Sequence, residues 1–167
     1  MASPNIFEYT IPELLDLETD EALQFSQFDN EIAWKLGCFA RRLSLEKFPS
    51  SAVVIDIALV NNQILFHATT KSGTTLDNDQ WVERKKRTVQ RLGTSSFVVG
   101  QHLRQKKTSM EDALFISSRD YASHGGCVPI KVKGFDGLVG TLTISGLPQD
   151  QDHLLALETL REFNKGD

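Results

Sequence analysis

The sequence predicts an α/β domain of the α+β type, in which helices cover a central, mainly antiparallel sheet. Two pairs of strand-like segments are each joined by a short turn, and helical patterns lie between the pairs and at both ends. Strands joined by short turns pair antiparallel, which disfavours a doubly wound parallel sheet. The chain of 167 residues, 40% hydrophobic and 24% charged, suits one core better than two.

The first half of the chain contains one helix and one hairpin. Residues 1–24 are expected to form an N-terminal arm or a short helix around Pro12–Leu17, ahead of a single domain over residues 25–167. Apolar residues recur at three- and four-residue steps over Phe28–Leu43, which predicts an amphipathic helix. Ala52–Val60 and Gln63–Thr70 are rich in aliphatic and β-branched residues and flank two asparagines, a pattern typical of a β-hairpin.

After the first hairpin the sequence predicts two helices and a loop. Leu76–Leu92 has a helical period and ends at Gly93, and a second short helix is expected over Ser95–Arg104. Gln105–Ser109 is predicted to be an exposed polar loop.

A second hairpin and a last helix complete the chain. Cys127–Lys133 and Leu138–Ser145 flank a glycine-containing turn and predict the hairpin. Pro148, placed as prolines are in a first helical turn, precedes a C-terminal helix with an apolar face.

Several classes of protein are disfavoured by what the chain lacks. Residues 1–20 contain acids and no Lys or Arg, unlike a signal or transit peptide, and no apolar run has the length of a membrane span. The two cysteines, Cys38 and Cys127, are far apart and suggest neither a disulfide framework nor a metal site. We therefore expect a cytoplasmic protein with no direct membrane insertion. No nucleotide-binding, zinc-protease, hydrolase or covalent-haem motif is present, which favours a protein other than an enzyme without deciding the question.

Charge is unevenly distributed. The net charge is -4, yet the segment from Arg84 to Lys107 contains eight basic residues and no acid. This segment predicts either a solvated basic face or a patch that meets an acidic surface, on another subunit or on a partner protein. Nucleic acid is not expected, because the domain is acidic overall and aromatic residues are not interleaved with the basic ones.

Two charged residues interrupt apolar patterns. Lys85 lies within the apolar stripe of the predicted helix, so it either reaches the edge of the buried face or is held in a pocket with a counter-charge. Asp56 interrupts a strand expected to be covered. An ion pair between Asp56 and Lys85, an Asp56 bonded to a nearby loop, and a pair that lines a ligand site are the alternatives.

Histidines and glycines mark a second place of interest. The glycines of His124-Gly125-Gly126 permit a turn or a close approach, and His124 is a candidate ligand or proton carrier. His153, near the start of the last helix, is expected to be a core or interface residue. Ser145 precedes that helix, whose N-terminus is not expected to hold an anion, because aspartates already occupy its first turn.

Three stretches, in this order, resemble a known family: Leu76–Lys85, Tyr121–Gly126 and Ser145–His153. They are similar to an uncharacterised family of the GlcG/HbpS-like superfamily, often labelled haem-degrading domain, and the resemblance extends from Phe25 to Phe163. It implies a profilin-like α-β-α sandwich and assembly into dimers or larger rings. Distant relatives bind haem or accompany small-molecule metabolism, and fungal-type members imply a cytosolic accessory role linked to delivery of tail-anchored membrane proteins. The resemblance assigns no haem ligand in this chain.

Three hypotheses follow. The first is an oligomeric, non-enzymatic binding or accessory protein, and the second is a haem- or small-molecule-handling protein that uses a His/Lys/Asp pocket. The third is an adaptor that binds a protein partner through Arg84, Lys86 and Arg87. The candidate ligand-binding residues are Asp56, Asn78, Trp81, Arg84, Lys85, His124, Gly125, Gly126, Ser145 and His153.

Overall fold

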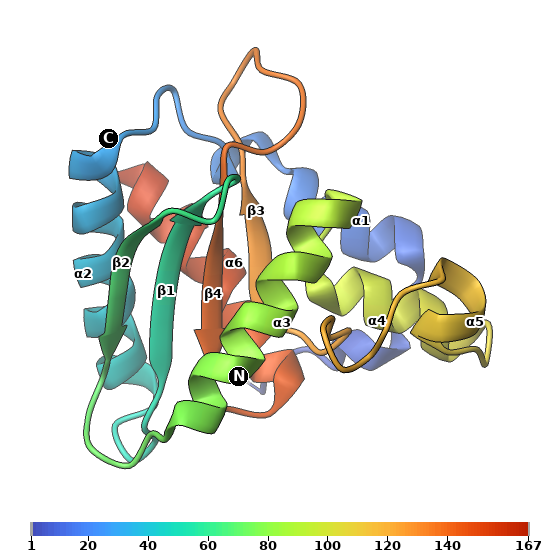
Figure 1. Ribbon diagram of the computed structural model, residues 1–167. Helices are drawn as coiled ribbons and strands as arrows, with labels where there is room; N and C mark the ends of the chain where they lie inside the picture. The colour runs from blue at the N-terminus through green and yellow to red at the C-terminus, as the bar shows by residue number, and fades with distance from the viewer. Residues whose placement is uncertain (1, 167) are drawn as a thin grey trace.

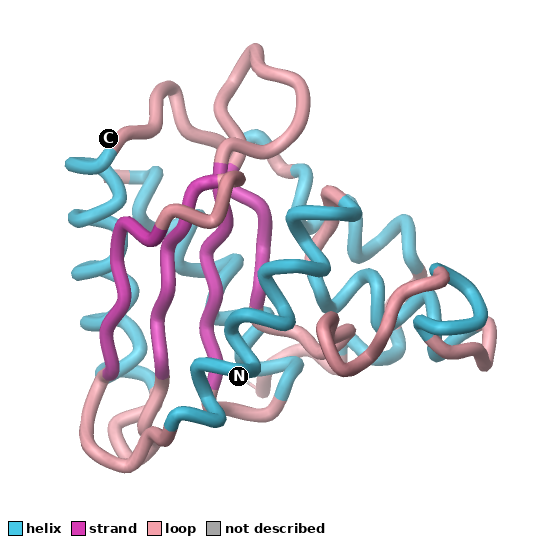
Figure 2. Tube along the Cα trace, in the orientation of Figure 1, coloured by secondary structure: helices cyan, strands magenta, loops and turns pink. Residues whose placement is uncertain are grey.

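A four-stranded antiparallel sheet, in the order β2-β1-β4-β3, forms the centre of the computed structural model, which describes residues 2–166 (Figure 1). Helices α2 and α6 cover one face of this sheet and α3 crosses the other, so the predicted α-β-α arrangement is confirmed (Figures 1 and 2). The elements in chain order are η1 (Ile6–Glu8), α1 (Ile11–Thr19), η2 (Glu21–Leu23), α2 (Asn30–Lys47), β1 (Val54–Leu59), β2 (Ile64–Thr69), α3 (Leu76–Leu92), α4 (Ser96–Gln105), α5 (Met110–Leu114), β3 (Cys127–Ile130), β4 (Gly140–Ser145) and α6 (Gln149–Lys165).

Both predicted hairpins are present, and a non-local pairing joins them. The turn of the first contains Asn62 at a positive φ of 70°, a conformation that asparagine tolerates better than most residues. The long loop of the second uses Gly134 and Gly137 at positive φ. Between the hairpins, β1 pairs antiparallel with β4 and places Asp56 opposite Thr143.

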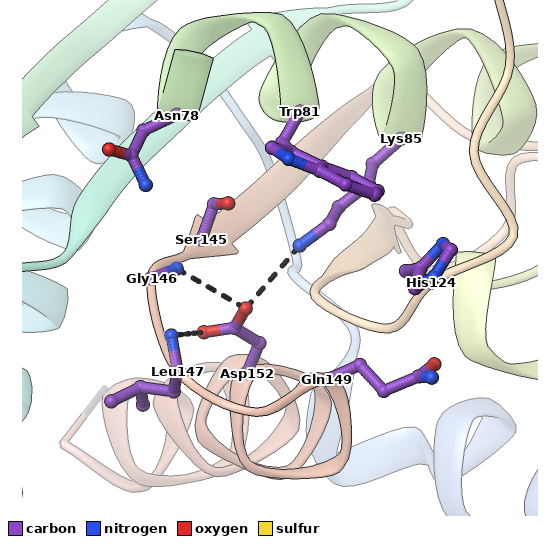
Figure 3. A pocket seen from close by; sticks show the side chains of 9 residues that line it. All are labelled: Asn78, Trp81, Lys85, His124, Ser145, Gly146, Leu147, Gln149 and Asp152. Atoms are coloured by element: carbon purple, nitrogen blue, oxygen red, sulfur yellow. Dashed lines mark hydrogen bonds and ion pairs between the residues drawn. The ribbon is translucent and has the colours of Figure 1, made fainter. Parts of the chain in front are cut away.

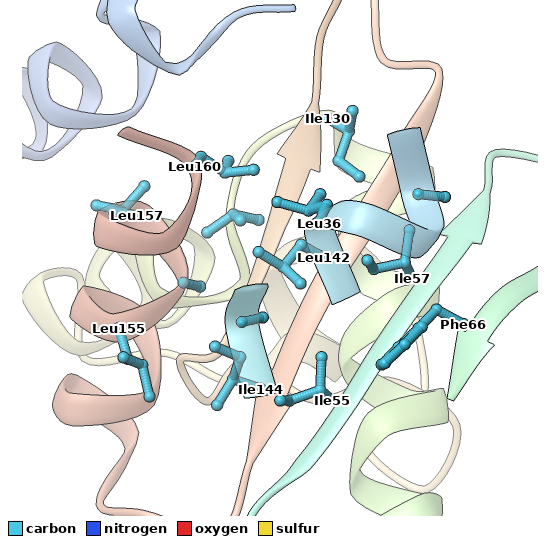
Figure 4. Packing of buried hydrophobic residues seen from close by; sticks show 14 of the residues in the cluster. Leu36, Ile55, Ile57, Phe66, Ile130, Leu142, Ile144, Leu155, Leu157 and Leu160 are labelled. Carbon is cyan, nitrogen blue, oxygen red and sulfur yellow. The ribbon is translucent and has the colours of Figure 1, made fainter. Parts of the chain in front are cut away.

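The two faces of the sheet differ in polarity because side chains alternate along each strand. The face toward α2 and α6 is apolar and includes Ile55, Ile57, Leu142 and Ile144 (Figure 4). The face toward α3 carries Asp56, Thr141 and Thr143, all at most 1% exposed. Helix α3 therefore packs on a buried polar layer, where charged side chains have partners within reach.

Helix ends follow the expected chemistry. Helix α3 begins with a capping box between Thr75 and Asn78 and ends at Gly93, whose φ of 77° is left-handed. Helix α6 begins one residue later than predicted, because Pro148 is its N-cap.

Part of the N-terminal segment is helical. Helix α1 buries Leu14, which packs with Ile6 against Phe97 and Val98 of α4. After α4, residues 106–109 form a loop as predicted, and the five-residue helix α5 that follows was not predicted. Within residues 2–166, no helix is long and apolar enough to cross a membrane.

Candidate functional site

A cavity of about 380 Å³ lies between α3, the loop that joins β4 to α6, and the turn before β3 (Figure 3). Asn78, Trp81 and Lys85 recur at three- and four-residue steps, so one face of α3 forms its wall. The lining consists of Asn78, Trp81, Lys85, His124, Ser145, Gly146, Leu147, Gln149 and Asp152. This volume is within the range of small-molecule sites.

A buried ion pair forms the floor of the cavity. Lys85 is 3% exposed, and its Nζ lies 3.3 Å from Asp152 Oδ2 and 3.4 Å from the carbonyl oxygen of Ile144. Asp152 also accepts from the backbone amides of Gly146 at 3.4 Å and Leu147 at 3.1 Å (Figure 3). These amides precede α6, so the carboxylate of Asp152 already occupies the position that an anionic ligand would take there.

Asp152 titrates close to neutrality. Burial raises the pKa of Asp152 to about 7, although Lys85 and the two backbone amides act in the opposite direction. A carboxyl group with such a pKa is both a donor and an acceptor at physiological pH. A buried carboxyl group with a strongly shifted pKa beside a lysine is typical of functional sites.

The glycines of His124-Gly125-Gly126 let the loop approach this floor. Gly126 has a φ of 128°, and a Cβ there would lie 2.8 Å from Lys85 Nζ and 2.2 Å from the oxygen of Ile144. Gly125 donates its backbone N–H to Gln149 Oε1 at 3.1 Å. Larger residues at either position would therefore displace the loop from α6 and the cavity.

An aromatic pair stands at the mouth of the cavity. The rings of Trp81 and His124 meet edge to face with centroids 4.8 Å apart, and the guanidinium of Arg84 lies 4.1 Å from the Trp81 ring centroid. Desolvation lowers the pKa of His124, and the positive charges of Lys85, Arg104 and Arg84 lower it further. The imidazole of His124 is therefore neutral at pH 7.

The structure brings together five of the predicted site residues as lining: Asn78, Trp81, Lys85, His124 and Ser145. Arg84 flanks the aromatic pair, and Gly125 and Gly126 support the loop. Four further lining residues were not predicted as members of the site: Gly146, Leu147, Gln149 and Asp152. Asp152 is one of the aspartates expected in the first turn of the last helix, but its pairing with Lys85 depends on a long-range contact.

The predicted ion pair between Asp56 and Lys85 is wrong, because Asp56 pairs with the next lysine. Lys86 is fully buried, and its Nζ lies 3.3 Å from Asp56 Oδ1 and 2.7 Å from Glu83 Oε1. His67 Nδ1 lies 2.8 Å from Asp56 Oδ2, and its Nε2 lies 3.0 Å from Asp79 Oδ1. Asp56 is therefore part of a network between α3 and the first hairpin, outside the cavity lining.

His153 also lies outside the cavity lining. It is fully buried, its ring stacks on Phe97 at 4.9 Å with an interplanar angle of 20°, and neither ring nitrogen has a hydrogen-bond partner among the described residues. Burial lowers the pKa of His153 to about 3. The structure therefore gives His153 the core position expected from the sequence and no access to a ligand in the cavity.

The basic segment is a smaller surface than the sequence suggested. Lys85 and Lys86 are buried in ion pairs, which leaves Arg84, Arg87, Arg91, Arg104, Lys106 and Lys107 at least partly exposed. Lys86 therefore does not contribute to a partner-binding face. Within residues 2–166, no group of three or more His, Cys, Asp or Glu side chains is arranged to hold a metal ion.

Comparison with known proteins places the chain among relatives of similar length. The sequence profile described as "Haem degrading protein HbpS-like" matches residues 28–161. A UPF0303 protein of Psychromonas ingrahamii is 39% identical over 158 residues, which cover 95% of each chain. The UPF0303 protein YBR137W of Saccharomyces cerevisiae is 40% identical over 153 residues, which cover 92% of this chain and 83% of that protein.

Solved structures agree with the fold. A crystal structure of Ybr137w protein superposes with a TM-score of 0.89 at 39% identity, covering 95% of this chain and 90% of that chain. A crystal structure of a PduOC:Heme complex superposes with a TM-score of 0.65 at 18% identity, covering 81% of this chain and 94% of that chain. The latter likeness is one of fold alone.

Proposed function

The chain belongs to the HbpS-like family, and we propose that it is a binding protein for an acidic small molecule with a flat portion. The observation that carries the proposal is the aromatic pair of Trp81 and His124, which stands over the buried pair of Lys85 and Asp152. A flat ligand packs against aromatic rings, and a few convergent polar groups fix its orientation.

The polar groups of the cavity suit hydrogen bonding to such a ligand. An ammonium has three donors, and two of those of Lys85 meet the Ile144 carbonyl and Asp152, which leaves one for a ligand. The side chains of Asn78, Ser145 and Gln149 add amide and hydroxyl groups around the floor. This arrangement favours binding with no requirement for a catalytic step.

Native mass spectrometry of the purified protein tests the proposal, with the second of the two tryptophans as a matched control. The wild type and Trp34→Ala are expected to carry a bound acidic small molecule, and Trp81→Ala is expected to lose it. Trp34 is 60% exposed on α2, away from the cavity lining. A wild type without any bound small molecule, or equal loss from both variants, would show that the cavity is not the binding site.

Haem is a second candidate, and the environment of His124 favours it. Its neutral, exposed imidazole meets the requirement for an axial iron ligand, and Arg84 and Lys85 are cations near it for propionate groups. Bound haem would supply an iron centre at His124. The apolar part of the lining is restricted to Trp81 and Leu147, so the site fits one edge of a porphyrin and leaves the rest open.

Haem titration distinguishes this candidate from the first. The Soret absorption of added haem is expected to shift with the wild type and with His102→Ala, a control at an exposed histidine outside the cavity lining. With His124→Ala, no shift of the Soret absorption is expected. Identical spectra for the wild type and His124→Ala would exclude ligation by His124.

We propose homo-oligomeric assembly as a separate property. Val60 and Ile64, on either side of the turn between β1 and the edge strand β2, are 48% and 51% exposed, and apolar surface of this kind is typical of interfaces. Light scattering on the wild type and on Ile64→Glu is expected to show an oligomer that the variant weakens. A monomeric wild type would contradict this proposal. The cytoplasmic location, a protein partner for the basic segment and the role in tail-anchored protein delivery stay predictions.

A further inference from the structure

A second hollow, of about 600 Å³, adjoins the cavity and shares His124 with it. It lies between α3, α4, the start of α5 and the segments on either side of that helix. We call it the arginine groove, because Arg84 and Arg104 line it together with Lys107. One carboxylate, that of Glu111, also lines the groove and accepts from the backbone N–H of Ser118 at 2.7 Å. Basic side chains therefore exceed acidic ones.

Arg104 is held in place by neutral groups. Its Nε and Nη2 donate to Gln101 Oε1 at 3.1 and 2.9 Å, and its guanidinium carbon lies 5.2 Å from the ring centroids of both Phe7 and Phe97. Gln101 is itself anchored, because its Nε2 donates to the carbonyl oxygen of Phe7 at 2.7 Å. The orientation of this guanidinium is fixed without any carboxylate.

Room for Arg104 depends on a glycine. A Cβ at Gly100 would lie 2.9 Å from Arg104 Nη1 and 2.0 Å from the backbone oxygen of Ser123. The helix α4 can therefore approach the loop before β3 and leave Nη1 at the groove. The contact with the backbone oxygen of Ser123 excludes a side chain at position 100, so this wall of the groove depends on glycine.

Arg84, on α3, is ordered in a comparable way. Its guanidinium lies over Trp81, and its Nη1 is 3.5 Å from the carbonyl oxygen of Ser118. Among residues 2–166, no carboxylate lies within 4.0 Å of either guanidinium. Two cations without a carboxylate partner give the groove a positive potential, which attracts an anion.

We infer that the arginine groove binds an oxyanion of the phosphate class, with Arg84 and Arg104 as its anchors. Each guanidinium presents a planar fork of donors that matches two oxygens of a phosphate or carboxylate. The excess of basic lining favours a dianion. The inference goes beyond the proposed function, because Arg84 and Arg104 line the groove and not the cavity, whereas Trp81 lines the cavity and not the groove.

Isothermal titration with inorganic pyrophosphate, at constant ionic strength, tests the inference. Arg104→Met and Arg84→Met are each expected to weaken binding about tenfold or more, the loss typical of a charged hydrogen bond. Arg87→Met removes the same charge from an exposed position on α3 outside the groove, and is expected to bind within about twofold of the wild type. Arg104→Lys keeps the charge and loses the planar fork of donors. It is expected to bind pyrophosphate more tightly than Arg104→Met and less tightly than Arg87→Met.

The outcomes separate the groove from the cavity. Pyrophosphate binding that persists in Trp81→Ala supports the groove even where the mass spectra reject the cavity proposal. Citrate is titrated as the carboxylate ligand for comparison. Tighter binding of citrate than of pyrophosphate would contradict the inference that the groove prefers a phosphate-type oxyanion. Equal losses in Arg87→Met and Arg104→Met, or no saturable binding by folded wild type, would overturn the site itself.

Discussion

The buried ammonium of Lys86 gives the sharpest test of the packing between α3 and the sheet. Lys86 is fully buried against Asp56, which is 1% exposed, at 3.3 Å. Replacing Lys86 by methionine keeps most of the side-chain volume and leaves the carboxylate buried. Loss of one partner of a buried pair typically costs about 3–5 kcal/mol. That is a large share of the ~5–15 kcal/mol that stabilises an ordinary domain.

His67 makes this loss depend on pH. Burial lowers the pKa of His67, but its bonds to Asp56 and Asp79 together outweigh burial and raise it above the usual value. At about pH 6 the protonated imidazole still neutralises Asp56. The free energy of unfolding of Lys86→Met is therefore expected to be about 3 kcal/mol below that of the wild type. The loss is expected to grow as the pH rises through the raised pKa of His67, because Asp56 then has no cationic partner.

Urea unfolding followed by circular dichroism, between about pH 6 and pH 9, measures both quantities. Lys106→Met is the matched control, because Lys106 is exposed and forms no ion pair among the described residues. Asp56→Asn combined with Lys86→Met removes both charges and is expected to recover part of the loss. Equal midpoints for Lys86→Met and Lys106→Met would refute the buried pair.

Three further changes test other parts of the structure. Gly37→Ala would place a Cβ 2.3 Å from the ring of Phe66, so urea titration is expected to show a loss of about 1–3 kcal/mol despite alanine's better helix propensity. Burial raises the pKa of Asp152 from 3.8 to about 7, so its contribution to stability is full below about pH 4 and is lost as the pH rises through 7. Asp152→Asn should remove that dependence, which amounts to at most about 4 kcal/mol; an unchanged pH profile would contradict the assignment. Glu18 accepts the N–H of Ser95 at 3.0 Å, and thermal unfolding of Glu18→Ala is expected to show a loss of about 1–3 kcal/mol in stability. An unchanged stability would contradict a role of Glu18 in joining α1 to α4.

Local signals were enough to predict most of the elements. The helix from Leu76 to Leu92 has the predicted bounds, because its capping residues and its period are all contained in that stretch. Both hairpins follow from turn residues that lie between their strands. Helix α5 has only five residues, too few for a period to be recognised.

Partners across the fold were harder to predict. The apolar stripe left two alternatives for Lys85, and the structure has the one in which Lys85 is buried with a counter-charge; Lys86, the next residue on the same helix, is buried as well. Which strand lies under each lysine depends on the β1–β4 pairing, which joins segments far apart in the sequence. His67 was predictable, because the register of a hairpin with a turn at residues 61–62 places it opposite Asp56.

The distribution of counter-charges indicates how a ligand would be oriented. Lys85 is neutralised by Asp152, so an acidic group that entered the cavity would have to displace a buried carboxylate or protonate it. The guanidiniums of Arg84 and Arg104 are ordered by rings and amides instead, and an anion reaches them without breaking an ion pair. The acidic end of a ligand therefore belongs in the groove and its flat end against Trp81. A ligand in this orientation passes His124, which lines both hollows, so substitution of that histidine should weaken flat acids and leave pyrophosphate affinity nearly unchanged.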